Sequence, residues 1–366
     1  MPESPAYSAK VWREFRVRAR IFFNDNHNGM KCIVLDSTHS DGIAYTELRE
    51  PVPGPEEVKV RIHAAALNHR DQWCREQKYP NLKDGIILGS DGAGEVVDIG
   101  SKVDKSWIGK RVLINPALNW GDNQAAQHPD FRILGMPDHG TFAEYCCVPA
   151  DRVHQIPAHL DSVHAAALPL AGLTAYRALV YQGQIKKGDR VLVTGFGGGV
   201  AQLSVQFALA SGARVAVTSG SGWKLEKALE MGVEAGYFYH SESWVEEAKG
   251  NSAGFDLIID SAMGSTVNDL LELVRPGGSI VVYGATLGTI KEVNARNLFW
   301  KQVRLQGSTM GSDRDFEQML DLVRHYSIQP TIDRVVPLSE AVSAFDKMEK
   351  TEQLGKLVLQ IKGTEW

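Results

Sequence analysis

The chain has 366 residues, of which 43% are hydrophobic and 23% charged, and its formal net charge at pH 7 is −5. The length predicts two domains, and the composition is that of a packed globular protein. The small negative charge disfavours nucleic acid and acidic membranes as partners, and no apolar run reaches the roughly 18 residues that predict a membrane span. We therefore expect a soluble, cytoplasmic protein that acts on a small molecule.

Residues 1–29 are predicted to be a disordered or loosely attached extension. Basic residues at positions 10, 13, 16, 18 and 20 are interleaved with apolar ones, as in an amphipathic mitochondrial presequence. Glu3, Glu14 and Asp25 break the acid-poor composition of such leaders, and Met30 opens the first strand-like run. A mitochondrial location is the alternative if this segment is a presequence, and its place in the mature protein stays open.

Residues 30–158 have the pattern of a β-rich domain. Strands are predicted at 31–35, 57–66, 92–99 and 111–114, with Gly and Pro between them. Segment 115–140 is long and polar, and we expect an ordered surface lobe because structureless loops of that length are uncommon in compact domains. The four cysteines, Cys32, Cys74, Cys146 and Cys147, form no C-x-x-C pair. They are predicted to be buried free thiols in a reducing compartment.

From about residue 160 the pattern becomes alternating helices and strands, beginning with a helical segment at 161–181. Strands are predicted at 190–194, 214–218, 256–260 and 279–283, and helices at 200–210, 224–231 and 265–273. Short, continuous apolar strands between helices predict an α/β fold with a doubly wound parallel sheet. A further strand at 301–308 and a helix at 313–325 follow. A helix at 335–350 and a strand at 356–361 are predicted to return to the first domain.

A glycine-rich turn after the strand at 190–194 is the strongest sign of a ligand. Gly195, Gly198 and Gly199 lie between the strand and a helix that starts near Val200, and Ala201 completes a G-x-x-G-x-x-A spacing. Glycines allow the backbone to approach a pyrophosphate, and the helix N-terminus offers it free N–H groups. The turn therefore predicts a dinucleotide site, with a turn that binds nothing as the alternative.

The end of the second strand bears on the choice of cofactor. NAD sites place an acidic residue there to hold the ribose 2′-hydroxyl, and residues 218–224 contain no Asp or Glu. Ser219 and Lys224 could instead donate to a 2′-phosphate. We therefore predict NADPH rather than NADH, with a solvated Lys224 as the alternative.

Several segments in order resemble the medium-chain dehydrogenase/reductase superfamily over residues 30–362. These segments are 64–71, 88–97, 172–176 and 187–191, together with the glycine turn and the pair Asp260 and Ser261. The resemblance implies a GroES-like β-rich catalytic domain, formed by residues 30–158 and 312–366, and a Rossmann cofactor-binding domain at 159–311. It also implies a homodimer formed through edge strands of the nucleotide-binding domains.

The resemblance to the zinc-free quinone oxidoreductase-like and enoyl reductase-like branch depends on the metal-ligand positions. Zinc-dependent relatives hold catalytic zinc at positions that match Asn68, Ser90 and Leu170. Asparagine and serine are poor zinc ligands, and a leucine side chain cannot coordinate zinc. The second, structural zinc needs four cysteines in the lobe, and residues 115–140 contain none. His128 and His139 are too sparse to replace them. We therefore predict that neither zinc binds.

The resemblance places the substrate pocket between the domains, near Asn68, Asp71, Trp73 and Tyr79. Asn68 is the candidate to hydrogen-bond the substrate or the nicotinamide ribose, Trp73 a stacking surface, and Tyr79 a proton donor or a wall. The alternatives are that Asp71 pairs structurally with Arg70 or His69 and that Tyr79 only packs.

The resemblance also implies further contacts to the cofactor. Thr174 and Gly284 would lie near the nicotinamide, Tyr239 beside the 2′-phosphate, and Ser308 would begin a segment, 308–311, whose backbone binds the carboxamide. Asp260 and Ser261 complete the predicted set of cofactor-binding residues.

These features together predict an NADPH-dependent oxidoreductase that transfers hydride to a quinone, an enone, an enal or a related carbonyl without zinc. Conjugate reduction suits a metal-free site because the enolate needs only hydrogen bonds and a proton. Two alternatives stay open: an alcohol or aldehyde dehydrogenase activity, and a nucleotide-binding protein with little catalysis.

Overall fold

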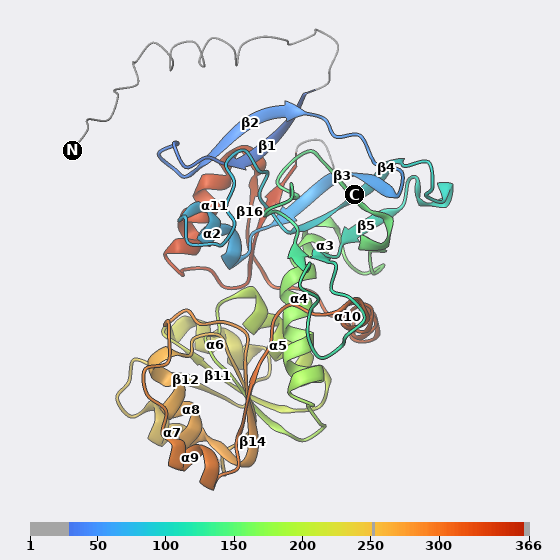
Figure 1. The fold of residues 1–366 in the computed structure, drawn as a ribbon. Helices are drawn as coiled ribbons and strands as arrows, with labels where there is room; N and C mark the ends of the chain where they lie inside the picture. Colours follow the sequence, from blue (N-terminus) through green and yellow to red (C-terminus); the bar gives the residue numbers. More distant parts are fainter. Residues whose placement is uncertain (1–28, 251–252, 362–366) are drawn as a thin grey trace, which may run out of the picture.

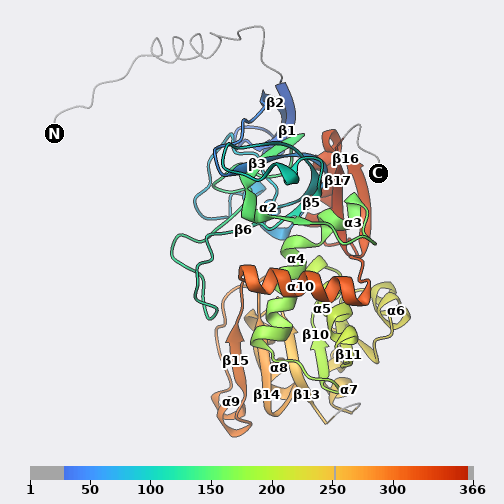
Figure 2. The ribbon, with the colours of Figure 1, turned by 90° about the vertical axis from the view of Figure 1, so that its right-hand side faces the viewer.

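The computed structural model describes residues 29–250 and 253–361. Of the predicted extension at 1–29, all but Gly29 lies outside the described residues, and Gly29 begins the first strand. Figure 1 shows a β-rich half above and a parallel sheet flanked by helices below. In Figure 2, helix α10 (Asp313–Tyr326) crosses between the two halves. None of the helices within the described residues combines the length and apolar composition that crossing a bilayer requires.

The β-rich half is built on one mixed sheet. Its strands, in the order in which they pair, are β16 (Ile332–Pro337), β17 (Lys356–Gln360), β3 (Glu57–Ala66), β4 (Asp91–Ile99), β5 (Arg111–Ile114) and β9 (Val153–Gln155), and β8 (Tyr145–Pro149) also pairs with β3. Buried Val58, Val60 and Ile62 alternate with more exposed residues along β3, as expected for a strand with one face on the core. Strands β1 (Gly29–Leu35) and β2 (Ile43–Arg49) form an antiparallel hairpin.

The other half is a six-stranded parallel sheet within the described residues. Its order is β12 (Ala235–Phe238), β11 (Arg214–Ser219), β10 (Arg190–Val193), β13 (Phe255–Asp260), β14 (Val274–Val282) and β15 (Arg304–Gly307). Numbered along the chain this order is 3-2-1-4-5-6, the order of a Rossmann fold. The associated helices are α5 (Gly199–Ala210), α6 (Gly222–Glu230), α7 (Trp244–Gly250), α8 (Val267–Leu273) and α9 (Ala295–Trp300). The predicted α/β architecture is thus confirmed.

Several elements differ from the sequence predictions. The single helix expected at 335–350 is strand β16 followed by helix α11 (Ala341–Glu349), because Pro337 follows two β-branched residues that suit a strand. The helix expected at 161–181 is divided into α3 (Ser162–Ala167), α4 (Pro169–Tyr176) and a π-helical turn (Arg177–Gln182). Pro169 starts α4 because proline is favoured in the first helical turn. Strands β2, β8, β9 and β12 were not predicted, nor were the two short strands at residues 117–118 and 132–133.

Lobe 115–140 is ordered and is attached to the nucleotide-binding half through a buried arginine. The Arg177 guanidinium donates to the backbone oxygen of Gln124 at 2.7 Å and forms an ion pair with Asp315 at 2.6 Å. It also lies over the Trp120 ring, 4.7 Å from the ring centroid. Within the lobe, β6 (Ala117–Leu118) pairs with β7 (Arg132–Ile133). The lobe therefore joins helices α4 and α10 to the β-rich half.

Candidate active site

A cleft of about 750 Å³ is lined by residues from both halves of the molecule. Most of the residues predicted from the sequence line it: Asn68, Trp73, Tyr79, Thr174, Gly195, Gly198, Gly199, Val200, Ala201, Ser219, Lys224, Tyr239, Ser261 and Gly284. The predicted residues that do not line it are Asp71, Asp260 and Ser308. The structure thus gathers the glycine turn and the residues near Asn68 around one cleft.

The glycine turn provides a site for an anion. Gly195 has φ +66°, a left-handed conformation that favours glycine. Gly198 is the N-cap of α5 and has an extended conformation. No described side chain caps this helix, so its first N–H groups can bind a ligand. A Cβ at position 198 would meet no atom within 4 Å, which leaves open space beside the helix N-terminus. The turn therefore fits the pyrophosphate of a dinucleotide.

A segment near the C-terminus lies against the glycine turn. The Gly355 N–H donates to the Gly197 carbonyl at 2.8 Å, and the Lys224 ammonium donates to the Thr351 carbonyl at 2.9 Å. Lys224 is buried, and burial lowers its pKa. Residues 351–356, which we call the covering segment, thus form one wall of the nucleotide site.

The end of β11 forms the part of the cleft that fits an adenosine ribose. A Cβ at Gly220 would lie 2.6 Å from the Tyr239 hydroxyl and 2.8 Å from His240 Nε2, so both side chains closely flank this backbone. Of the described residues that line the cleft, only Glu352 carries a carboxylate, and it belongs to the covering segment. His240 also lines the cleft and was not predicted, although it directly follows the predicted Tyr239.

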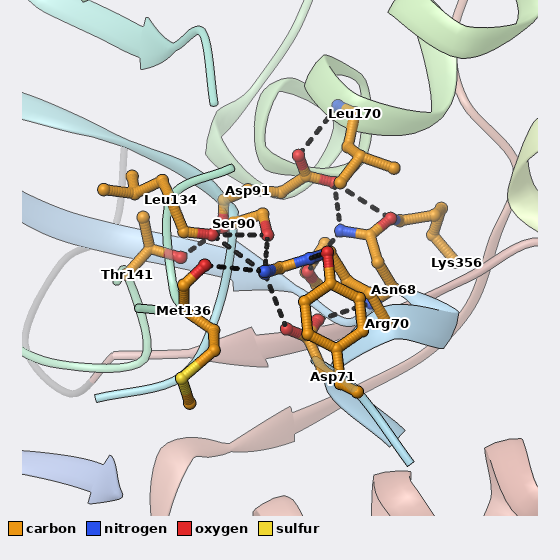
Figure 3. Close-up of polar contacts among 12 residues, drawn as sticks. Asn68, Arg70, Asp71, Ser90, Asp91, Leu134, Met136, Thr141, Leu170 and Lys356 are labelled. Carbon is orange, nitrogen blue, oxygen red and sulfur yellow. Dashed lines mark hydrogen bonds and ion pairs between the residues drawn. The ribbon is translucent and has the colours of Figure 1, made fainter. Parts of the chain in front are cut away.

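A network of buried polar groups surrounds Asn68, which lines the cleft, and Figure 3 shows its contacts. Asn68 donates from Nδ2 to Asp91 Oδ2 at 2.9 Å. The Lys356 ammonium donates to Asn68 Oδ1 at 2.6 Å and to Asp91 Oδ2 at 3.0 Å. The other oxygen of Asp91 accepts from the Leu170 N–H at 2.8 Å. Both polar atoms of the Asn68 amide are therefore held by charged neighbours.

Arg70 fixes a second part of this network. Its guanidinium donates to Ser90 Oγ at 2.7 Å and to the Leu134 carbonyl at 2.9 Å, and it also reaches Met136 of lobe 115–140. The Arg70 guanidinium carbon lies 4.7 Å from the centroid of the Tyr79 ring. Arg70, which the sequence suggested only as a partner for Asp71, thus packs against the Tyr79 ring and holds lobe 115–140.

Asp71 differs from its predicted role at the reacting centre. It is fully buried in helix α2 (His69–Arg75), and its carboxylate accepts from the Asn68 N–H at 2.8 Å in a capping box. Burial raises the pKa of Asp71 to about 6. Arg70 lies 3.8 Å away. Asp71 therefore holds the backbone of Asn68 at the start of α2, and it does not line the cleft.

Asp260 and Ser308 also lie behind the cleft. Asp260 accepts from Thr194 Oγ1 at 2.6 Å and from the Met263 N–H at 2.7 Å, and burial raises its pKa. The Ser308 N–H donates to the Val282 carbonyl at 2.7 Å. Asp260 ends β13 and Ser308 follows β15, and the nearby residues Ser261 and Met310 line the cleft instead.

The side chains at the zinc-ligand positions do not fit a zinc ion. Asn68, Ser90 and Leu170 provide an amide, a hydroxyl and an alkyl group, whereas zinc binds thiolate, imidazole and carboxylate. Two cations, Lys356 and Arg70, already donate to the amide and the hydroxyl. Across residues 29–250 and 253–361, no three or more His, Cys, Asp or Glu side chains are grouped so as to hold a metal.

Comparisons with known proteins match both halves of the chain. The alcohol dehydrogenase GroES-like domain matches residues 54–158, and the zinc-binding dehydrogenase family matches residues 199–325. A zinc-type alcohol dehydrogenase-like protein of Leptosphaeria maculans is 35% identical over 85% of this chain and 92% of its own. An acryloyl-coenzyme A reductase of Sulfurisphaera tokodaii is 27% identical over 90% of this chain and 100% of its own. The crystal structure of an NAD-dependent alcohol dehydrogenase gives a TM-score of 0.85 at 33% identity, over 90% of this chain and 99% of that one.

Proposed function

This chain belongs to the medium-chain dehydrogenase/reductase superfamily, and from that premise we propose an NADPH-dependent reductase of quinones, enones, enals or related carbonyls that works without zinc. Its GroES-like and Rossmann domains make it an NAD(P)-dependent oxidoreductase. The observation that carries the finer proposal is the buried cluster of Asn68, Asp91 and Lys356, in which an ammonium group binds the residues next to the metal position.

The preference for NADPH is supported by the side chains around the end of β11. Lys224, Tyr239 and His240 line this part of the cleft, and Ser219 and Ser221 add hydroxyl donors. A 2′-phosphate would find cationic and hydroxyl groups there, whereas a bare ribose would find no carboxylate at the strand end to accept its hydroxyls.

The choice of acceptor follows from what the cleft offers in place of a metal. Bound NADPH supplies the hydride, and the protein has to orient the acceptor and stabilise the negative charge that develops on it. Quinones and enones accept hydride at a carbon conjugated to the carbonyl, so hydrogen bonds to the oxygen suffice. An alcohol dehydrogenase, by contrast, needs strong polarisation of an isolated carbonyl or alcohol.

The proposal is tested on the purified full-length chain. We expect NADPH to quench tryptophan fluorescence at lower concentration than NADH, because Trp73 and Trp223 both line the cleft. NADPH should then be consumed with a panel of quinones, enones and enals, after metal analysis has shown less than a tenth of an equivalent of zinc. Stoichiometric zinc, or activity only with primary and secondary alcohols, would overturn the proposal.

Two other functions are separated by the same measurements. An alcohol dehydrogenase is the second candidate, because the Leptosphaeria maculans protein is described as a zinc-type alcohol dehydrogenase-like protein. Nicotinamide binding without turnover of any acceptor would instead indicate a binding protein with little catalysis.

We propose that residues 30–158 and 312–366 form the catalytic domain and residues 159–311 the cofactor domain. We also propose that the chain forms a homodimer through β15. This strand ends the parallel sheet, so its outer edge has no neighbouring strand among the described residues. Phe299 and Trp300, beside this edge in sequence, are 66% and 76% exposed. Exposed apolar side chains next to a free sheet edge are typical of an interaction surface.

A further inference from the structure

Lys356 lies between the glycine turn and the buried cluster of Asn68 and Asp91. Its aliphatic stem lies against the start of helix α5, since a Cβ at Gly199 would come within 2.5 Å of Lys356 Cδ. Its ammonium group then extends to Asn68 and Asp91, 288 residues away from Asn68 in sequence. Lys356 is only 4% exposed, and it lines the cleft. The side chain therefore presents a cation to the ligand space from within a buried network.

The hydrogen bonds of this network leave one donor unused. An ammonium group has three N–H donors, and within the described part of the chain Lys356 directs two of them at Asn68 and Asp91. Asp91 provides the counter-charge, and its two oxygens are taken up by Asn68, Lys356 and the Leu170 N–H. A third donor next to the cleft is available for an oxygen atom of a bound molecule.

We infer that Lys356 is a catalytic residue whose ammonium group replaces the metal ion as the electrophile, an inference that depends on the proposed function. When hydride adds to the β-carbon of an enone, the C=C electron pair shifts and the carbonyl oxygen becomes an enolate oxygen. The Lys356 N–H donates a hydrogen bond to this oxygen and stabilises the new charge. A proton from solvent then adds to the α-carbon, so lysine remains protonated and the net consumption is one hydride and one proton.

Substitution of Lys356 by methionine, which keeps the length of the stem, tests this role. We expect kcat for an enone to fall at least 100-fold at saturating NADPH, with the Kd of NADPH changed less than threefold. Lys356→Arg should recover part of the lost kcat, because a guanidinium also donates to an oxyanion. The exposed Lys350→Met is the matched control and should leave kcat unchanged.

Removal of the Lys356 ammonium group alone would leave the buried Asp91 carboxylate without a counter-charge. The folding of the variant is therefore monitored by circular dichroism. If Lys356→Met does not fold, the double variant Asp91→Asn, Lys356→Met removes both charges and is measured instead. A weaker NADPH affinity in proportion to lost activity, with kcat intact at saturation, would mean that Lys356 only binds a cofactor phosphate and would overturn the inference.

A binding measurement separates this inference from the proposed function. 4-Nitrophenolate mimics an enolate oxygen, and its absorption spectrum reports binding to the complex of the chain with NADP⁺. We expect Lys356→Met to weaken this binding at least tenfold, and unchanged binding would overturn the inference. If the native chain reduces no acceptor but binds the phenolate through Lys356, the proposed function fails and the oxyanion site stands.

Discussion

The Lys224 side chain lies between two separate parts of the cleft, the covering segment and the glycine turn. Its ammonium donates to Thr351 of the covering segment, and a Cβ at Gly197 in the glycine turn would lie 3.1 Å from its Nζ. It lies in the first turn of α6, the helix that follows the end of β11. A cofactor phosphate near this helix start would therefore face a charge that is already held in place.

We predict that Lys224→Ala weakens NADPH binding by about tenfold or more and NADH binding much less, because an ion pair to the 2′-phosphate is charge-assisted. Fluorescence titrations with both nucleotides give the two Kd values. Lys227→Ala, in the same helix but paired with Glu230 at the surface, is the control and should change neither. Equal weakening of both nucleotides would show that Lys224 acts only by holding the covering segment.

The sequence revealed individual site residues where the signal was local. The glycines at 195, 198 and 199 and the missing acid after β11 are visible in a short window, because strand, turn and helix follow one another. Lys356 was not predicted as a site residue because its partner Asn68 is 288 positions away, and no pattern within a strand indicates such a contact. Asp71 was misplaced because the sequence does not distinguish a helix-capping carboxylate from one that faces a ligand.

The covering segment and the glycine turn form one structural unit although different domains supply them. Gly198 and Gly355 make a parallel bridge, and Gly355 has φ +103°. A Cβ at position 355 would overlap the Thr331 carbonyl oxygen. Only glycine allows the backbone to turn there and still reach the cofactor site.

Gly355→Ala should therefore lower both stability and cofactor affinity. We expect a loss of about 2 kcal/mol or more in the free energy of unfolding, from backbone strain and the close contact, and a weaker affinity for NADPH. Urea denaturation and fluorescence titration measure the two effects. Gly232 has a similar φ of +94°, but a Cβ there would meet no atom within 4 Å. Gly232→Ala therefore measures the backbone strain alone and should leave NADPH binding intact. A native-like Gly355→Ala variant would contradict this account of the segment.

The parallel sheet was easier to predict than the β-rich half. Its strands are buried on both faces and give continuous apolar runs, such as Val191–Val193 in β10. Exposed and less exposed residues alternate along β2, and β16 buries only Val336, so neither strand gives a continuous apolar run. Their identity depends on partners elsewhere in the chain, since β16 pairs with β17 and β2 with β1.

Among the described residues the parallel sheet ends at β15 without a further neighbouring strand, and Leu305 on this strand is 38% exposed. We predict that Leu305→Glu converts the proposed dimer to a monomer, because two carboxylates would face each other across a symmetric edge pairing. Sedimentation velocity at several concentrations measures the change. Leu229→Glu, at a 51% exposed position on α6, is the control and should stay dimeric. A native chain that sediments as a monomer throughout would rule out the edge-to-edge dimer.

The pairing of strand β17 with β3 also determines when the molecule can be completed during its synthesis. A ribosome adds about 5–20 residues per second, so Asn68 emerges roughly 15–60 s before Lys356. Once residue 307 has emerged, residues 190–307 contain the whole parallel sheet, but the β-rich half still lacks β17, which pairs with residues 64–66 of β3. The nascent chain therefore presents an open strand edge and an unneutralised Asp91. A chaperone that shields such edges would be needed most just before β17 leaves the ribosome tunnel.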